Sequence, residues 1–204
     1  MENSKIVDQK LNHDFSKVKK IDIFKNAEIL GIRENNGSLI FDFFNRQIIF
    51  SQDGIDDAKG ILLTDAVKDV LRQYLHMCPD PTCESSNKLV TLREFSGSGP
   101  LFSRFTANAG KIIETTFSGN LEKLINRCLA LGGTILENAS YDLSVRFKAL
   151  SRIPIFLNFN DKEDMLPASA GFLFQDNADK YLDLKSLSIL CTYLTGQLIQ
   201  EIPG

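Results

Sequence analysis

Hydrophobic positions along the chain recur at two spacings, one typical of helices and one typical of strands. Apolar residues three and four apart predict amphipathic helices over residues 64–77, 120–131 and 184–199. Thr64 is a suitable N-terminal cap for the first of these helices, and Pro79 follows its end. These three segments are the helices that the sequence defines best.

Residues 1–50 predict a pair of helices followed by a hairpin. Residues 3–19 place apolar side chains on one helical face, and a second, shorter helix is expected to end at Gly31. Asn36-Gly37 is a turn signal, and the run "SLIFDFFNRQIIF" predicts two strands folded about Asn45-Arg46.

Strand signals dominate the C-terminal part of the chain. In "SVRFKAL" and "IPIFLNF" every second residue is apolar, so we expect neighbouring antiparallel strands covered by the helices at 64–77 and 184–199. Helices and strands alternate without the βαβ rhythm of a parallel sheet. We therefore expect an α+β fold, a single globular domain over residues 1–204 with a mainly antiparallel sheet packed by amphipathic helices and a hairpin-plus-helix unit at 142–200.

Composition narrows the class of protein further. The chain has 204 residues, 43% of them hydrophobic and 24% charged, with a formal net charge of −3 and both signs interspersed. These values are typical of a globular protein, and the absence of a basic run argues against nucleic acid as a partner. No signal peptide or membrane-spanning run is apparent, so we expect a cytoplasmic protein with reduced cysteines and no membrane partner. The sequence leaves the oligomeric state open.

The glycine, lysine and serine residues of the chain do not have the spacing of phosphate-binding or nucleophile motifs. Gly110-Lys111 lacks the residues that a phosphate loop requires on either side. The segment Gly97-Ser98-Gly99 matches neither a dinucleotide fingerprint nor a nucleophile elbow, and its glycines are expected to form a loop. His13 and His76 fall on the polar sides of their predicted helices, which favours exposed surface histidines.

Metal ligands are also poorly spaced. His76, Cys78 and Cys83 lie close together in "HMCPDPTC", but no second ligand pair completes a zinc or iron site. We therefore expect no bound metal and no cofactor.

An acidic turn at residues 161–164 offers the remaining candidate chemistry. Its carboxylates, together with Asp176 and Asp179 shortly after the next strand, could bind a hard cation or serve as acid and base, although charges at a hairpin tip are usually solvated. Arg152 is the nearest candidate counter-charge. The candidate ligand-binding residues are Arg152, Asp161, Glu163, Asp164 and Asp176, and no catalytic residue is assigned.

Residues 152–190 resemble the C-terminal signature of the family named domain of unknown function 3786. The matching places are Arg152 with Ile153-Pro154, the acidic turn, Pro167-Ala168, Phe172 to Gln175, and Tyr181-Leu182. The segments "VTLREF" and "VLRQYLHM" fit as well, so the resemblance spans most of the chain. Phe159 and Met165-Leu166 stand where the family pattern has Trp and Phe-Pro.

The resemblance implies an uncharacterised bacterial or archaeal protein from a group frequent in anaerobes. Some relatives are labelled iron–sulfur proteins, but this chain lacks the Cys-x2-Cys type of run that holds such clusters.

Two hypotheses for function remain open. The first is a non-catalytic accessory or ligand-binding protein with an unknown protein or small-molecule partner. The alternative is a metal-assisted enzyme that uses the carboxylates of the 161–164 turn.

Overall fold

The computed structural model describes residues 23–79 and 82–200. The predicted helix at 3–19 and His13 therefore lie outside the described residues. The helices are α2 (Ile23–Leu30), α3 (Asp65–His76), α4 (Gly99–Asn108), α5 (Gly110–Phe117), α6 (Leu121–Ala130), α7 (Ala178–Tyr181) and α8 (Leu184–Ile199), with a short 3-10 turn η1 (Leu92–Glu94). The strands are β1 (Arg33–Asn35), β2 (Ser38–Phe43), β3 (Arg46–Phe50), β4 (Ile55–Asp57), β5 (Leu89–Thr91), β6 (Thr134–Leu136), β7 (Leu143–Leu150), β8 (Ile153–Asn160) and β9 (Ser169–Gln175).

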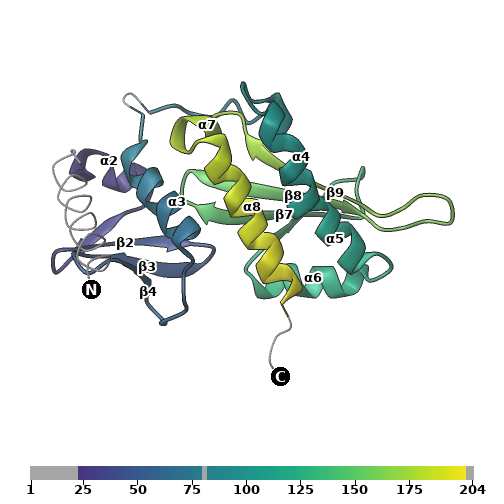
Figure 1. The fold of residues 1–204 in the computed structure, drawn as a ribbon, viewed down its shortest axis with the longest axis horizontal. Coiled ribbons are helices and arrows are strands. Elements are labelled where there is room, and N and C mark those ends of the chain that lie inside the picture. The colour runs from purple at the N-terminus through teal and green to yellow at the C-terminus, as the bar shows by residue number, and fades with distance from the viewer. Residues whose placement is uncertain (1–22, 80–81, 201–204) are drawn as a thin grey trace.

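The predicted α+β class is confirmed, but the strands form two sheets where one was expected. The first has four strands in the order β1-β2-β3-β4, and the second has five in the order β5-β9-β8-β7-β6 (Figure 1). Every strand pairing in both sheets is antiparallel. The predicted neighbours "SVRFKAL" and "IPIFLNF" are β7 and β8, which pair along their whole length.

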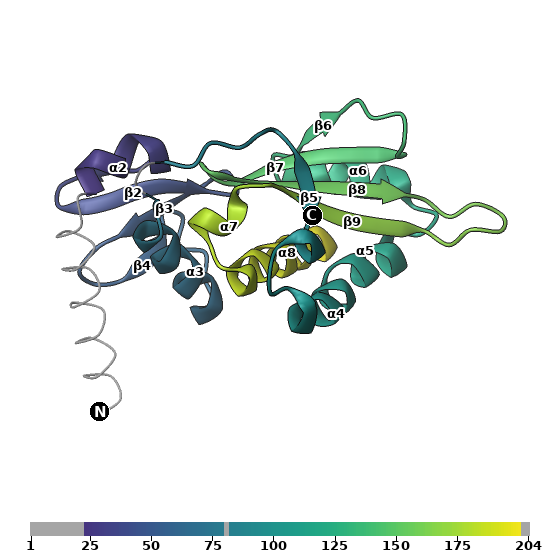
Figure 2. The same ribbon diagram turned by 90° about the horizontal axis from the view of Figure 1, so that it is seen from above.

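Four helices, α3, α4, α5 and α8, lie on one side of the two sheets (Figure 2). Helix α8 lies in front of β7 and β8 as predicted, whereas α3 lies in front of the four-stranded sheet and packs against α8 (Figure 1). Buried hydrophobic side chains from both sheets and from these helices form one contiguous cluster. This shared core fixes the two sheets side by side.

The two sheets meet at the β2–β3 hairpin, whose turn is shifted by one residue from the predicted position. Phe44 and Asn45 occupy the turn with φ values of 45° and 58°, so Arg46 already belongs to β3 and pairs with Phe43. The Phe44 ring packs on the ring of Tyr193 in α8, with 5.6 Å between centroids. The Phe44 backbone N–H also donates to the carbonyl of Ala149 in β7 at 3.1 Å. Tertiary contacts therefore hold an aromatic residue in a backbone conformation that normally favours Gly or Asn.

Candidate functional site

A polar cavity of about 520 Å³ opens at the β7–β8 turn end of the five-stranded sheet. We call it the basic pocket, because its charged lining consists of three cations, Arg146, Lys148 and Arg152, and one carboxylate, Glu84. The polar side chains that complete the lining are Asn45, Ser85, Asn87, Thr134, Ser151, Gln175 and Asn177. The pocket therefore combines net positive charge with many groups that donate hydrogen bonds.

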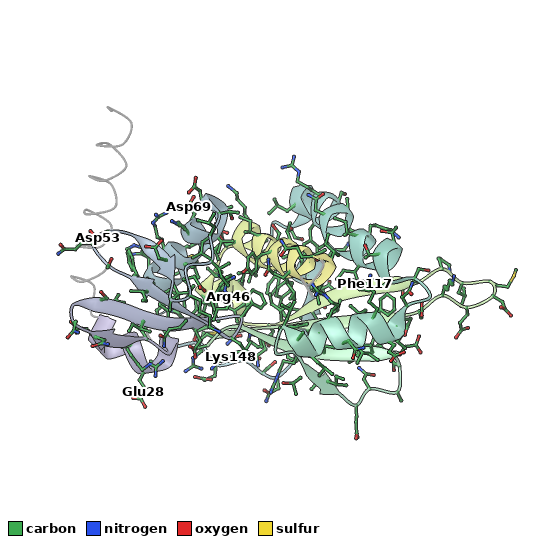
Figure 3. The ribbon with its side chains drawn as sticks, turned by 90° about the horizontal axis from the view of Figure 1, so that it is seen from below. Glu28, Arg46, Asp53, Asp69, Phe117 and Lys148 are labelled. Carbon is green, nitrogen blue, oxygen red and sulfur yellow. The ribbon has the colours of Figure 1, made fainter. Side chains whose placement is uncertain are left out.

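Strand β7 supplies two of the three cations through the alternation of its side chains. Val145, Phe147 and Ala149 are buried in the core, so Arg146 and Lys148 project from the opposite face and are exposed. Figure 3 shows Lys148 on the face of the sheet away from α8. A register irregularity between Lys148 and Leu150 marks the end of the regular β7–β8 ladder beside the pocket, a place where β-bulges commonly redirect side chains.

Arg152 lies in the turn between β7 and β8 and is held by three groups. Its backbone N–H donates to the hydroxyl of Tyr74 at 3.1 Å, and its Nε donates to the carbonyl of Ile29 at 3.1 Å. Its Nη1 lies 3.2 Å from Glu84 Oε1, although the side chain of Glu84 is 72% exposed. An ion pair with such an exposed carboxylate is weak, so an anion from solution can replace Glu84 at modest cost.

The wall opposite β7 is the segment from Cys83 to Asn87, which is fastened at both ends. At its start, the carbonyl of Cys83 accepts hydrogen bonds from Asn177 Nδ2 at 2.7 Å and from the Tyr181 hydroxyl at 3.1 Å. At its other end, Asp176 Oδ1 accepts from Ser85 Oγ at 2.8 Å and from the Ser86 N–H at 3.1 Å. The segment leading to β5 runs on the side of the sheet away from α8 (Figure 2).

Asp176 is therefore a structural anchor beside the pocket. Hydrogen bonds from the Ser86 side chain, then from the Ser85 side chain, hold the pKa of its carboxyl below the usual value. A carboxylate with a lowered pKa is a poor proton acceptor at neutral pH. The Ser85 hydroxyl that donates to it consequently lacks the strong base that would make it a nucleophile.

The acidic turn contributes to a different cavity, of about 490 Å³, which we call the acidic cavity. Its carboxylates are Asp142, Asp161 and Glu163. Asp161 Oδ1 accepts hydrogen bonds from the backbone N–H groups of Gly119 and Lys162, and Asp142 Oδ2 accepts from the Asp161 N–H at 2.8 Å. Two of these carboxylates thus already accept hydrogen bonds from backbone N–H groups, two of them on segments distant in sequence. Asp164 is exposed and lies outside the lining.

The five candidate residues from the sequence do not converge on one site. Arg152 and Asp176 lie at the basic pocket, whereas Asp161 and Glu163 lie at the acidic cavity beyond the other end of β8. An eight-residue strand is about 25 Å long, which separates the two groups widely. The proposed pairing of Arg152 with the acidic turn is therefore wrong, because Arg152 pairs with Glu84.

Most residues of the basic pocket carry no signal in the sequence that marks them as a site. Arg146 and Lys148 had a usable signal, because they are the polar residues that alternate with buried ones in "SVRFKAL". Asn45, Glu84 and Gln175 had none, since they come from segments far apart in the chain that only the tertiary structure brings together.

The cysteines do not form a ligand set for a metal cluster. Cys128 and Cys191 are fully buried, and burial raises the pKa of Cys128 to about 12 and that of Cys191 in the same direction. Such thiols stay protonated and are poor metal ligands. Among residues 23–79 and 82–200, no three His, Cys, Asp or Glu side chains are placed to hold a metal ion.

Comparison with known protein families gives a match over most of the chain. A family described as a domain of unknown function, DUF3786, matches residues 22–197. No curated protein and no solved structure matches the chain. Within the described residues, no helix has the length and apolar character needed to cross a membrane. The matched range takes in both sheets and the helices that cover them, and it confirms the resemblance seen in the sequence: the chain belongs to the DUF3786 family.

Proposed function

We propose that the protein binds a small anionic molecule in the basic pocket and does not itself transform it. The observation that carries this proposal is the charge of the lining, three cations against one exposed carboxylate. Within the described part of the chain, the side chains of Arg146 and Lys148 make no hydrogen bond or ion pair with the protein. Two cations directed into a cavity without a protein partner are available to an anion.

The size of the pocket and its hydrogen-bond donors fit the same ligand class. About 520 Å³ falls within the range of sites for small molecules. The side-chain amides of Asn87 and Gln175 line the pocket beside the cations and can fix the orientation of carboxylate or phosphoryl oxygens. The ligand is therefore a compact anion with several oxygens.

Binding is tested by calorimetry with inorganic phosphate and with citrate as probes. The double variant Arg146→Gln and Lys148→Gln is expected to bind both probes at least about tenfold more weakly, because hydrogen bonds to charged groups contribute about 1.5–3 kcal/mol each. Glu84→Gln is expected to strengthen binding, because it removes the carboxylate that competes for Arg152.

The matched control for this test is the double variant Arg104→Gln and Lys185→Gln, which removes the same charge from a different face of the molecule. It should leave the affinity for phosphate and citrate within about twofold of the wild type. Equal weakening by the two double variants would contradict the proposal, because the effect would then come from net charge alone. Failure of both probes to bind at millimolar concentration would contradict it as well.

The alternative, a metal-assisted enzyme, would use the acidic cavity. The observation that favours it is that Asp142, Asp161 and Glu163 line one opening, although in the described residues they are not placed close enough together to hold a metal ion jointly. Its test is the melting temperature with and without Mg²⁺, for the wild type and for the triple variant Asp161→Asn, Glu163→Gln and Asp164→Asn. We expect no Mg²⁺-dependent stabilisation of either protein, since Asp142 and Asp161 already accept backbone hydrogen bonds. A rise in melting temperature seen only with the wild type would favour the enzyme.

A further inference from the structure

A second cavity, on the helical side of the molecule, has the opposite character to the basic pocket. It has a volume of about 540 Å³ and lies where α3 and α4 flank α8. Figure 1 shows α8 between these two helices. We call this cavity the helical groove. It is separate from the basic pocket, which lies on the other face of the five-stranded sheet.

The helical groove is apolar along its floor and cationic at its rim. Its larger apolar side chains are Val67 from α3, Leu101 and Phe105 from α4, and Ile189 and Tyr193 from α8. Its charged side chains are Arg104 from α4 and Lys185 from α8, and no carboxylate lines it. Both cations are exposed. An apolar surface edged by two cations is complementary to a molecule with an apolar body and an anionic end.

The two cations at the rim have no close side-chain partner in the described residues, although Lys185 attracts the Asp183 carboxylate electrostatically. In the described residues, the side chains of Arg104 and Lys185 make no hydrogen bond or ion pair. The carboxylate closest in sequence to Lys185 is Asp183, and it is already engaged as the N-cap of α8, accepting from the Ser186 N–H at 2.7 Å and from Gln73 Nε2 at 2.9 Å. Arg104 and Lys185 are therefore available to an anionic headgroup.

We propose that the helical groove binds an amphiphilic carboxylate, a molecule with an acyl chain and one terminal carboxylate. Arg104 and Lys185 hold the carboxylate, while Phe105, Ile189 and the neighbouring apolar side chains cover the chain. A partner helix fits less well. Helix-in-groove binding needs a row of anchors along several turns and an interface above about 1,000 Å², whereas this cavity is the size of a small-molecule site.

The proposal is tested by calorimetry with decanoate, below the concentration at which it forms micelles, and with decanol as a neutral analogue of the same chain length. Decanoate is expected to bind at least about tenfold more tightly than decanol, because only decanoate pairs with the two cations. The double variant Arg104→Gln and Lys185→Gln should remove most of this preference while leaving the affinity for decanol within about twofold. Both side chains are exposed, so the variant is expected to fold.

Two further variants separate the groove from general binding to apolar or cationic surface. Ile189→Ser, at a half-buried position on the groove floor, should weaken both probes. The double variant Arg146→Gln and Lys148→Gln, in the basic pocket, should weaken neither. Decanoate affinity that is unchanged by the changes at Arg104, Lys185 and Ile189 would overturn the proposal. So would tight binding of an acidic amphipathic peptide that decanoate fails to displace, since the groove would then be a protein-binding surface.

Discussion

Replacing Asp57 with alanine is expected to lower the free energy of unfolding by about 3–5 kcal/mol, a large part of the stability of an ordinary domain. Asp57 ends β4, and its side chain is 1% exposed. Its Oδ2 accepts from Arg46 Nε at 2.8 Å, and its Oδ1 accepts from the backbone N–H of Lys59 at 2.8 Å. Without the carboxylate, a largely buried guanidinium loses its counter-charge and a backbone donor loses its acceptor.

The cost is large because Arg46 joins the two sheets through α8. Its Nη1 donates to the hydroxyl of Tyr193, whose ring lies 5.1 Å from the ring of Phe43 between centroids. Figure 3 shows Arg46 toward the side of α8. Loss of Asp57 thus loosens the contact between the four-stranded sheet and the helix that covers the five-stranded one.

Urea unfolding at about pH 7 measures this effect. The control is Asp56→Ala, one residue earlier, whose side chain is 69% exposed and lies 3.8 Å from Lys68. It should change stability by less than about 0.5 kcal/mol. The double variant of Asp57→Ala with Arg46→Met should be more stable than the sum of the single changes, because the unpaired charge is then absent. Similar losses for Asp56→Ala and Asp57→Ala would contradict the prediction.

The contribution of Asp57 to the free energy of unfolding is expected to decrease in acidic solution. Burial acts to raise the pKa of Asp57, but hydrogen bonds from Arg46, Lys59 and Ile61 and the positive charge of Arg46 outweigh it and leave the pKa below its ordinary value. A lowered folded-state pKa gives stability that is complete above the unfolded-state pKa, about 3.9, and is lost as the pH falls through the folded-state value. The difference between wild type and Asp57→Ala should therefore be constant from about pH 7 to pH 5 and narrow in more acidic solution.

The elements that sequence analysis predicted correctly are those whose own pattern matches their environment. Helix α3 has a Thr64 cap whose hydroxyl accepts from the Val67 N–H at 3.3 Å, and its apolar stripe is buried. Burial alternates over residues 145–149 in β7 and over residues 153–157 in β8, and the buried residues of these stretches form one face of the core. In both cases, local preference and tertiary packing favour the same structure.

Helices α4 and α5 and the basic pocket, which the sequence did not predict, depend on contacts between distant segments. Helices α4 and α5 occupy residues 99–117, where Gly99 was expected in a loop, and the sequence "GPLFSRFTAN" has a weak intrinsic preference for helix. Packing of α4 against α8 therefore stabilises this helix despite its weak intrinsic helix preference. The basic pocket was missed for the same reason, since its wall depends on the bond from Ser85 to Asp176, 91 residues away.

Replacing Tyr74 is expected to have the second large effect on stability, and its size should depend on which atoms are removed. Tyr74 is fully buried in α3, and its hydroxyl donates to the Leu30 carbonyl at 3.3 Å and accepts from the Arg152 N–H at 3.1 Å. Tyr74→Ala should cost about 3–5 kcal/mol through the cavity it leaves. Tyr74→Phe should cost about 1–3 kcal/mol, because it leaves two buried backbone groups without a partner.

The stability difference at alkaline pH distinguishes the contribution of the Tyr74 hydroxyl from that of the ring. Burial is the main reason that the pKa of Tyr74 lies well above its usual value, so the folded protein keeps this proton after the unfolded chain, with a pKa of about 10, has lost it. Stability from such a group is complete below the unfolded-state pKa and is lost as the pH rises. Wild type and Tyr74→Phe should therefore differ most near pH 8 and converge toward about pH 11.

Urea unfolding at several pH values, with Tyr141→Phe as the control, completes the test. Tyr141 is an exposed tyrosine, and its replacement should change stability by less than about 0.5 kcal/mol at neutral pH. Arg152 provides a second readout, because the Tyr74 hydroxyl holds the turn that carries it. Tyr74→Phe should weaken phosphate binding in the basic pocket, whereas Tyr141→Phe should not. A stability difference between wild type and Tyr74→Phe that stays constant up to about pH 11 would show that the hydroxyl ionises alike in the folded and unfolded chain, contrary to its burial.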